Sequence, residues 1–385
     1  MSQSQPFAPL VEVTRGYEIE SEHAGAIAVV DSSGHLLASI GQPTQPAYLR
    51  SCAKPFQALA FVCSGAADAY GATEEELAVV CASHSGEPGH VALVESLMRK
   101  TGVTQEDLLC GIHPPFDKNV RDRLNAEGKS ANALHNNCSG KHVGMIATAK
   151  HLDLPFEDYI DPEHPVQLAI LGLLASLAGL EPDEIGVSID GCSVPVFYVP
   201  LRSFSLALAR LAEQGEGSDA WLRHPRVDDD QDLDIDELHE EPEEETMELS
   251  DGFPVSIQEG LSRVWRAMIR HPFVIAGSSA RICTDLMRVA EQFGVPLLAK
   301  SGAEGTYAIA AFHEDEGIGI TVKVEDGGQR ARDAAVVECL LQLGILPDEA
   351  RGPLAGYHRQ LVQTLRGEAV GEVRPVFRLN RGLPR

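Results

Sequence analysis

The chain has 385 residues, of which 44% are hydrophobic and 23% are charged. This composition supplies enough apolar side chains for a large buried core and excludes a chain that is disordered throughout. The 57 acidic and 31 basic residues give a formal net charge of −26, which argues against a nucleic-acid or anionic-membrane surface.

Neither a membrane span nor an export signal is evident in the sequence. The apolar stretch 168–180 is shorter than the ~20 residues that cross a bilayer, and residues 1–11 lack a basic start followed by an apolar segment. The eight cysteines are scattered along a long chain, a pattern more typical of reduced thiols than of a disulfide scaffold. We therefore expect a cytoplasmic protein.

The N-terminal half predicts a hairpin followed by helices. The apolar runs 25–31 and 35–40 are joined by a turn sequence and predict two paired strands. A helix is expected from Pro55, because proline is favoured in a first turn, and Thr73 with Glu76 has the spacing of a capping box. Apolar spacing predicts further helices at 90–100, 141–152 and 165–180, and a strand and turn within 186–199.

The C-terminal third predicts alternating helices and strands. Helices are expected at 256–270, 280–294 and 330–346, and strands at 295–302, 306–312 and 317–325. Strands near both chain ends with helices between them predict a layered α/β fold whose sheet is built from both ends of the chain.

Residues 228–251 break the composition, with 14 acidic side chains and no lysine or arginine. Such a run repels itself and usually stays solvated. We interpret the segment at about 215–254 as a surface insertion in a single domain that spans 1–385. A loop that binds cations or a partner protein is the alternative.

Ser51 and Lys54 form the first candidate for chemistry. Their Ser-x-x-Lys spacing at the start of a helix places the amine one turn from the hydroxyl. A serine hydroxyl needs a base to become nucleophilic, and lysine acts as one only when burial or a second cation lowers its pKa. A surface serine beside an ordinary lysine is the alternative.

Two later motifs extend this pattern. Ser83 follows an apolar run, and Lys300 opens a Lys-Ser-Gly sequence at the end of a predicted strand. The order of the three motifs parallels that of penicillin-binding proteins and serine β-lactamases. It predicts two Ser–Lys pairs, Ser51 with Lys54 and Ser83 with Lys300.

A second cluster contains Cys138, Lys141 and Cys192, with Asp190 close by in sequence. Cys138 precedes a predicted helix, whose N-terminus favours a thiolate. Two thiolates, one further ligand and an open position would suit a zinc ion that polarises substrate. Two buried, inert cysteines are the alternative, and spacing alone favours them.

Several long motifs resemble the rhizobial-type, thermolabile L-asparaginases. These motifs follow one another in the same order from about residue 11 to residue 346, the extent that we take for the core of the domain. They are RSCAKPFQ (50–57), ASHSGEPGHV (82–91), HNNCSGKHVGM (135–145), DGCSVPVF (190–197), AKSGAEG (299–305) and VKVEDG (322–327).

The resemblance implies an amidohydrolase that converts L-asparagine to L-aspartate and ammonia. It implies an α/β/α sandwich similar to serine β-lactamases and glutaminases, with a mainly antiparallel sheet, and a homodimer. The nucleophile matches Ser51 with Lys54 as its base, and Ser83 with Lys300 match the second pair. A substrate-positioning zinc matches Cys138, Lys141 and Cys192.

Five further side chains are candidates for the substrate pocket. We expect Asp190, Cys138, Cys192, His84 and Arg281 to bind substrate, and His90 and Glu87 to line the pocket with His84 and Arg281. Ordinary turn and surface roles remain open for the histidines, Glu87 and Arg281.

Three other functions remain open at this point. One is a penicillin-binding or β-lactamase-like acyltransferase that uses Ser51 and Lys54. Another is an amidase with Cys138 as nucleophile and His142 as base. The third is a catalytically inactive binding protein, since fold alone does not establish function.

Overall fold

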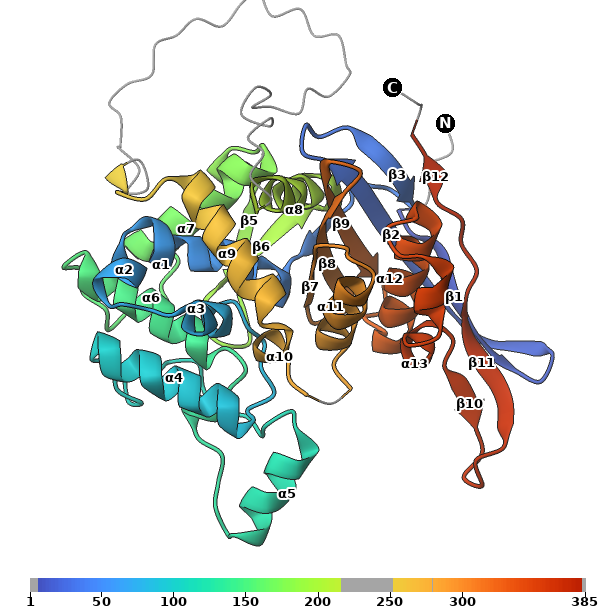
Figure 1. Ribbon diagram of the computed structural model, residues 1–385, viewed down its shortest axis with the longest axis horizontal. Helices are drawn as coiled ribbons and strands as arrows, with labels where there is room; N and C mark the ends of the chain where they lie inside the picture. The colour runs from blue at the N-terminus through green and yellow to red at the C-terminus, as the bar shows by residue number, and fades with distance from the viewer. Residues whose placement is uncertain (1–5, 216–251, 279, 383–385) are drawn as a thin grey trace, which may run out of the picture.

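The computed structural model describes residues 6–215, 252–278 and 280–382, and Figure 1 shows their arrangement. Its main feature is a nine-stranded sheet in which the described strand pairs are antiparallel, in the order β10-β11-β1-β2-β9-β8-β7, with β3 between β2 and β12. The strands are β1 (Ala8–Arg15), β2 (Glu18–Asp31), β3 (Leu36–Ile40), β7 (Leu297–Ser301), β8 (Thr306–His313), β9 (Glu316–Val324), β10 (Leu361–Gln363), β11 (Ala369–Pro375) and β12 (Asn380–Arg381). The sheet is therefore built from both ends of the chain.

Helices cover both faces of this sheet. Helix α8 (Leu201–Gly215) packs against β2, β8 and β9, while α11 (Ile282–Gln292) and α12 (Gln329–Leu343) cover the opposite face. The short helix α13 (Ala355–His358) packs beside α12. The arrangement is a layered α/β architecture with a largely antiparallel sheet, as the sequence predicted.

The remaining helices form a second region beside α8, on the left of Figure 1. Their bounds are α1 (Lys54–Cys63), α2 (Ala66–Ala69), α3 (Glu74–Val80), α4 (Pro88–Thr101), α5 (Lys118–Ala126), α6 (Ser139–His151), α7 (Pro165–Ala178), α9 (Ile257–Arg270) and α10 (Pro272–Ile275). A small antiparallel sheet of β4 (Pro46–Tyr48), β6 (Pro195–Pro200) and β5 (Gly186–Ile189) borders this region.

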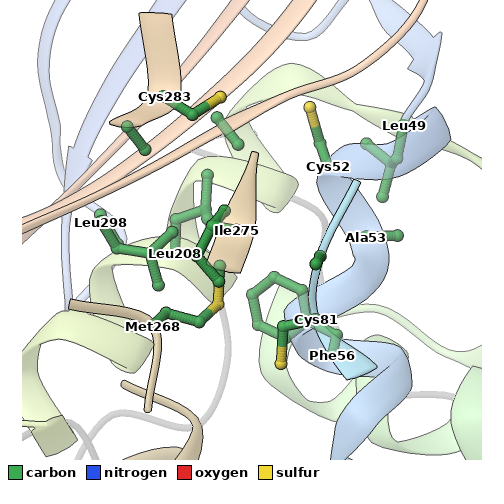
Figure 2. Packing of buried hydrophobic residues seen from close by; sticks show 14 of the residues in the cluster. Leu49, Cys52, Ala53, Phe56, Cys81, Leu208, Met268, Ile275, Cys283 and Leu298 are labelled. Carbon is green, nitrogen blue, oxygen red and sulfur yellow. The ribbon is translucent and has the colours of Figure 1, made fainter. Parts of the chain in front are cut away.

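A buried apolar cluster joins the two regions. Phe56 of α1 and Leu208 of α8 are fully buried, as is Leu298 of β7. Figure 2 shows these side chains in a shared interior together with Leu49, Met268 and Ile275. This packing fixes the start of α1 relative to the end of β7, the two elements that carry Lys54 and Lys300.

Glycines allow α8 to lie unusually close to the sheet. A Cβ atom at Gly319 of β9 would lie 1.7 Å from the backbone oxygen of Ser205 on α8. The Ser205 hydroxyl donates to the carbonyl of Ala28 (3.0 Å), and it forms a second hydrogen bond with the hydroxyl of Thr321 (2.8 Å). Helix and sheet are therefore joined by backbone contact as well as by side-chain packing.

Most elements expected from the sequence are present, including the 25–40 hairpin, the helix at Pro55 and the Thr73–Glu76 capping box. Strands β1, β4 and β10–β12 and helices α2, α5, α8, α10 and α13 were not expected. Because β10–β12 join the large sheet, it extends past residue 346, beyond the expected core. The acidic segment 228–251 lies outside the described residues.

No helix in the described part of the chain is long and apolar enough to cross a membrane.

Candidate active site

Ser51 lies in a strained turn at the entrance to α1. It belongs to a short 3₁₀ helix, Arg50–Ala53, and the backbone of Arg50 has φ 50°. A non-glycine residue in this left-handed region is uncommon and costly, and such residues concentrate at functional sites. The Arg50 Nε atom donates to Asp190 Oδ1 over 2.8 Å, so this ion pair links the turn to the segment that follows β5.

Lys54, the first residue of α1, is only 1% exposed. Its Nζ atom donates to Ala82 O (2.6 Å), Ser83 Oγ (2.9 Å) and Asn137 O (3.2 Å). Burial lowers the pKa of Lys54, partly opposed by the nearby Cys138 thiol. The side chain is therefore held inside the protein with its amine among hydrogen-bond acceptors.

Lys300, on β7, approaches the same hydroxyl from the other side. It is 1% exposed, and its Nζ atom donates to Ser83 Oγ (2.8 Å) and to Ser301 O (2.9 Å). Burial, reinforced by the positive charge of Lys54, lowers the pKa of Lys300 to about 7. The Ser83 hydroxyl thus bridges two buried amines.

The structure brings the four residues of the two predicted Ser–Lys pairs together, but one of the two expected serine–lysine hydrogen bonds is replaced by another. Ser83 and Lys300 form the expected hydrogen bond. The Lys54 amine turns to Ser83, and no hydrogen bond to the Ser51 hydroxyl is found among the described residues. Ser51 and Ser83 instead line one cavity. The catalytic roles of all four residues stay predictions.

This cavity has a volume of about 330 Å³, the size of a small-molecule site. It contains Arg281, as expected, and it also contains Arg332, which the sequence analysis did not single out. Its lining consists of Ser51, Ser83, Phe116, Asn137, Ala280, Arg281, Ile282, Cys283, Ser301, Gly302, Ala303, Glu304, Gly305, Gly327, Gln329 and Arg332.

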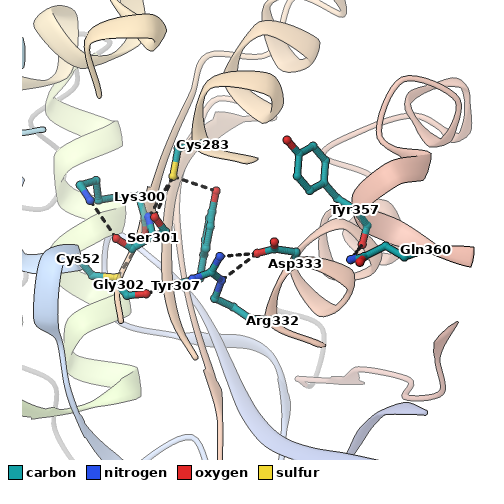
Figure 3. A network of polar contacts seen from close by, with 10 residues as sticks. All are labelled: Cys52, Cys283, Lys300, Ser301, Gly302, Tyr307, Arg332, Asp333, Tyr357 and Gln360. Carbon is teal, nitrogen blue, oxygen red and sulfur yellow. Dashed lines mark hydrogen bonds and ion pairs between the residues drawn. The ribbon is translucent and has the colours of Figure 1, made fainter. Parts of the chain in front are cut away.

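Arg332 of α12 forms the wall of the cavity beyond β7. Its Nε and Nη2 atoms donate to Asp333 Oδ1 (2.9 and 2.6 Å), and its guanidinium lies 5.5 Å from the ring centre of Tyr307. Figure 3 shows this ion pair beside the network that connects Tyr307, Cys283 and Ser301. The sequence signal for Arg332 was its place five residues after the 322–327 motif quoted above, near the start of the helix predicted at 330–346.

Cys138, Lys141 and Cys192 also come together, beside Lys54 rather than in the cavity lining. All three are buried, and Lys141 Nζ lies 3.2 Å from Cys192 Sγ. A hydrogen bond from the Cys192 thiol, together with the charges of Lys54 and Lys141, holds the pKa of Cys138 well below its usual range. Burial alone would lower the pKa of Lys141, but the two sulfur atoms raise it overall.

This donor set fits a zinc ion. Two sulfur donors, one of which ionises readily, and a lysine nitrogen offer three ligands and leave a fourth position for water or substrate. The described residues contain no cluster of three or more His, Cys, Asp and Glu side chains that could hold a metal, so a metal here would depend on Lys141. Zinc would have to displace the proton of that amine.

Besides Cys138 and Cys192, two more expected substrate contacts lie outside the cavity lining, His84 and Asp190. His84 is fully buried, its Nε2 atom lies 2.9 Å from Ser139 Oγ, and its Nδ1 atom accepts from Gly86 N. Burial lowers the pKa of His84 well below its usual range. Asp190 is paired with Arg50 as described above. Both side chains are therefore engaged in holding loops in place.

The neighbouring loop residues are engaged in the same way. His90 lies 4.6 Å from the ring centre of Phe273, and Glu87 accepts hydrogen bonds from the backbone and the hydroxyl of Ser278. Neither residue belongs to the cavity lining.

The alternative with Cys138 as nucleophile lacks its base. The Nδ1 atom of His142 lies 2.5 Å from the hydroxyl of Tyr159. In the described part of the chain the imidazole of His142 forms no hydrogen bond with the Cys138 thiol, and the two residues are joined only by the helical backbone bond from His142 N to Cys138 O. Burial lowers the pKa of His142 well below its usual range.

A comparison with models of known protein families identifies a match. The family model described as L-asparaginase II matches residues 11–232 and 238–375. It confirms the family resemblance that the motifs indicated. No curated protein matches the chain.

Proposed function

The chain belongs to the L-asparaginase II family and is an L-asparaginase, an amide C–N hydrolase, and we propose that it acts through an acyl-serine intermediate on Ser51. The observation that carries the proposal is the Ser83 hydroxyl, which bridges two buried amines at 2.9 and 2.8 Å on the wall of the cavity that Ser51 lines. Covalent catalysis requires a nucleophile and a group that can accept its proton, and here the candidate nucleophile shares a cavity with the hydroxyl that the two amines contact.

Acylation begins with attack of Ser51 Oγ on the side-chain amide carbon of L-asparagine. Lys54, in its neutral form, accepts the hydroxyl proton. The proton then passes to the amide nitrogen, through Ser83 and Lys300, as the C–N bond breaks and ammonia leaves. Backbone N–H groups near Ser51 stabilise the oxyanion, a contribution of ~3–4 kcal/mol per donor in other acyl-transfer enzymes.

Deacylation repeats these steps with water. A water molecule attacks the aspartyl ester and gives its proton to the same amines, and Ser51 regains a proton as L-aspartate leaves. Ser51 is favoured over Ser83 as nucleophile because it is the more exposed of the two hydroxyls and follows the strained residue Arg50.

Zinc completes the proposal. Cys138, Lys141 and Cys192 would hold the ion, which would supply a positive charge that orients the substrate. The two cysteines would thereby contribute to substrate binding through the metal, with Asp190 close to them. The chain's own residues carry every proton transfer described above.

The resemblance to serine β-lactamases is part of the same proposal. It is supported by the position of Ser51 and Lys54 at the start of a helix and of Lys300 on a sheet strand beside them. The homodimer and the cytoplasmic location stay predictions from the resemblance and from the sequence.

Ammonia release from L-asparagine tests the proposal. Ser51→Ala should abolish turnover while thermal unfolding stays unchanged, whereas Ser262→Ala on α9 should keep full activity. Full activity of Ser51→Ala would remove Ser51 as nucleophile. Covalent labelling by a penicillin, without ammonia release from asparagine, would favour the acyltransferase instead.

A further inference from the structure

The cavity contains an arginine that has no carboxylate partner among the described residues. Arg281 donates from Nη1 to Ser85 Oγ (3.2 Å) and from Nη2 to the backbone oxygen of Ser83 (2.8 Å), both of which are neutral acceptors. No carboxylate lies within ion-pair distance of Arg281 among the described residues. Since a guanidinium has five N–H donors, several remain for a ligand.

The other arginine in the cavity is different in this respect. Arg332 forms a buried ion pair with Asp333, with side chains 8% and 5% exposed, and its Nη1 atom donates to Gly302 O. Burial lowers the pKa of Arg281, and the positive charge of Arg332 adds to this effect. Of the two arginines that line the cavity, Arg281 is therefore the one without a carboxylate partner among the described residues.

The position of Arg281 is fixed from three sides. Two are the hydrogen bonds to Ser83 and Ser85, and the Ser85 hydroxyl is itself held by Ala276 O at 2.7 Å. The third is the ring of Phe116, whose centre lies 5.3 Å from the guanidinium carbon. A rigidly held arginine loses little entropy on binding a carboxylate in the bidentate geometry.

Strain also marks this position. Ala280, directly before Arg281, has φ 51°, the same left-handed conformation as Arg50 before Ser51. Both strained residues precede a polar side chain that lines the cavity. Strained backbone of this kind persists where the surrounding structure holds a functional side chain in place.

We infer that Arg281 binds the α-carboxylate of the substrate and so makes the site specific for amides that carry a free carboxylate. Arg281 contacts the backbone of Ser83, whose hydroxyl bridges the two lysines. In asparagine the α-carboxylate and amide carbons are three C–C bonds of ~1.5 Å apart, on the order of 4 Å in extended form. A carboxylate on Arg281 therefore leaves the amide near Ser51, while the thiol cluster lies outside the cavity lining.

The experiment compares two substrates in one series of variants. L-asparagine carries the α-carboxylate, and 3-aminopropanamide has the same chain without it. Arg281→Gln should lower kcat/KM for L-asparagine at least 100-fold, mainly through KM, but change kcat/KM for 3-aminopropanamide less than threefold. Arg281→Lys keeps the charge without the bidentate geometry. Its kcat/KM for L-asparagine should lie between those of the wild type and of Arg281→Gln.

A control and a binding measurement keep the inference independent of folding. Arg330 lies on the same helix as Arg332 but is bonded to His23 and Ser21. Arg330→Ala should therefore leave kcat/KM for both substrates unchanged. In calorimetry, succinate should bind the wild type and bind Arg281→Gln at least tenfold more weakly, while thermal unfolding confirms that the variant is folded.

The inference rests on the proposed function, and the outcomes separate the two. Lack of ammonia release by the wild type would overturn the proposed function itself. If the wild type is active, two results would overturn only the role of Arg281. In one, Arg281→Gln lowers kcat/KM equally for both substrates; in the other, it lowers kcat/KM for neither. Unchanged succinate binding by the variant would do the same.

Discussion

The amine of Lys54 lies 2.9 Å from the hydroxyl of Ser83, a residue 29 positions further along the chain. It does not form the expected hydrogen bond with Ser51, one helical turn away. The two Ser–Lys pairs are therefore not independent, because Ser83 connects Lys54 to Lys300. A proton that reaches either amine has a hydrogen-bonded path to the other.

Removal of this connection should slow proton transfer. Ser83→Ala should lower kcat by about 10²- to 10³-fold, within the range that general acid–base catalysis contributes, with little change in KM. Steady-state ammonia release measures both values. Ser83→Thr, which keeps a hydroxyl, should retain more activity than Ser83→Ala. An unchanged kcat in Ser83→Ala would exclude a proton relay through this residue.

Protonation of Lys300 should determine how kcat/KM falls on the acidic side of the pH profile. Its pKa is lowered to about 7 in the folded protein, so the amine is charged below this pH and neutral above it. If the neutral form carries protons, kcat/KM should rise through about pH 7. A profile that is flat between pH 6 and 8 would contradict this role.

A matched variant separates charge from geometry at this position. Lys300→Arg stays protonated throughout this pH range and should lose activity at every pH, without the acidic limb. Recovery of that variant at high pH would show that another group produces the limb.

The thiol cluster should affect binding more than chemistry. Cys192→Ala should lower the zinc content measured by elemental analysis and raise KM more than it lowers kcat, because one of the three expected ligands is lost. Cys339→Ala, a buried thiol on α12, is the matched control and should keep its zinc. Normal zinc content in Cys192→Ala, or a kcat defect at constant KM, would contradict a positioning metal.

The contact between α8 and the sheet should be sensitive to one methyl group. Gly319→Ala places a Cβ atom 1.7 Å from Ser205 O, so the helix must shift, and we expect a loss of about 3 kcal/mol, the upper end of the usual cost of overpacking. Chemical denaturation measures the change. Gly356→Ala, which meets no atom within 4 Å, should leave stability nearly unchanged. Equal stability of both variants would contradict the close packing.

The sequence predicted the helices and strands whose apolar pattern was strong. The capping box at Thr73 and the helix at Pro55 formed as expected, because their signals are local. Strand β1 and helix α8 were not recognised. On one side β1 pairs with residues 18–25 in a hairpin, which the sequence analysis missed. On the other side it pairs with residues 373–375, and pairing over that distance leaves no local signature. The buried polar residues of α8, such as Arg210, similarly obscured its apolar face.

The residues of the candidate site were predictable where they belong to short motifs, but their contacts in space were not. Short motifs identified Ser51, Lys54, Ser83 and Lys300, but spacing along a helix could not show which hydroxyl the Lys54 amine would reach. That depends on how α1 packs against the loop after α3. Arg332 went unrecognised because its neighbours in the cavity come from β7 and α11, far away in sequence.

The central claim is that the substrate becomes esterified to the hydroxyl of residue 51. The most direct measurement is peptide mapping by mass spectrometry after an acid quench during turnover of L-asparagine by Cys192→Ala or wild-type enzyme. The account predicts an added aspartyl group on the peptide that contains Ser51, and none in Ser51→Ala. An aspartyl group on Ser83 or Cys138, in an enzyme with unmodified Ser51, would contradict it.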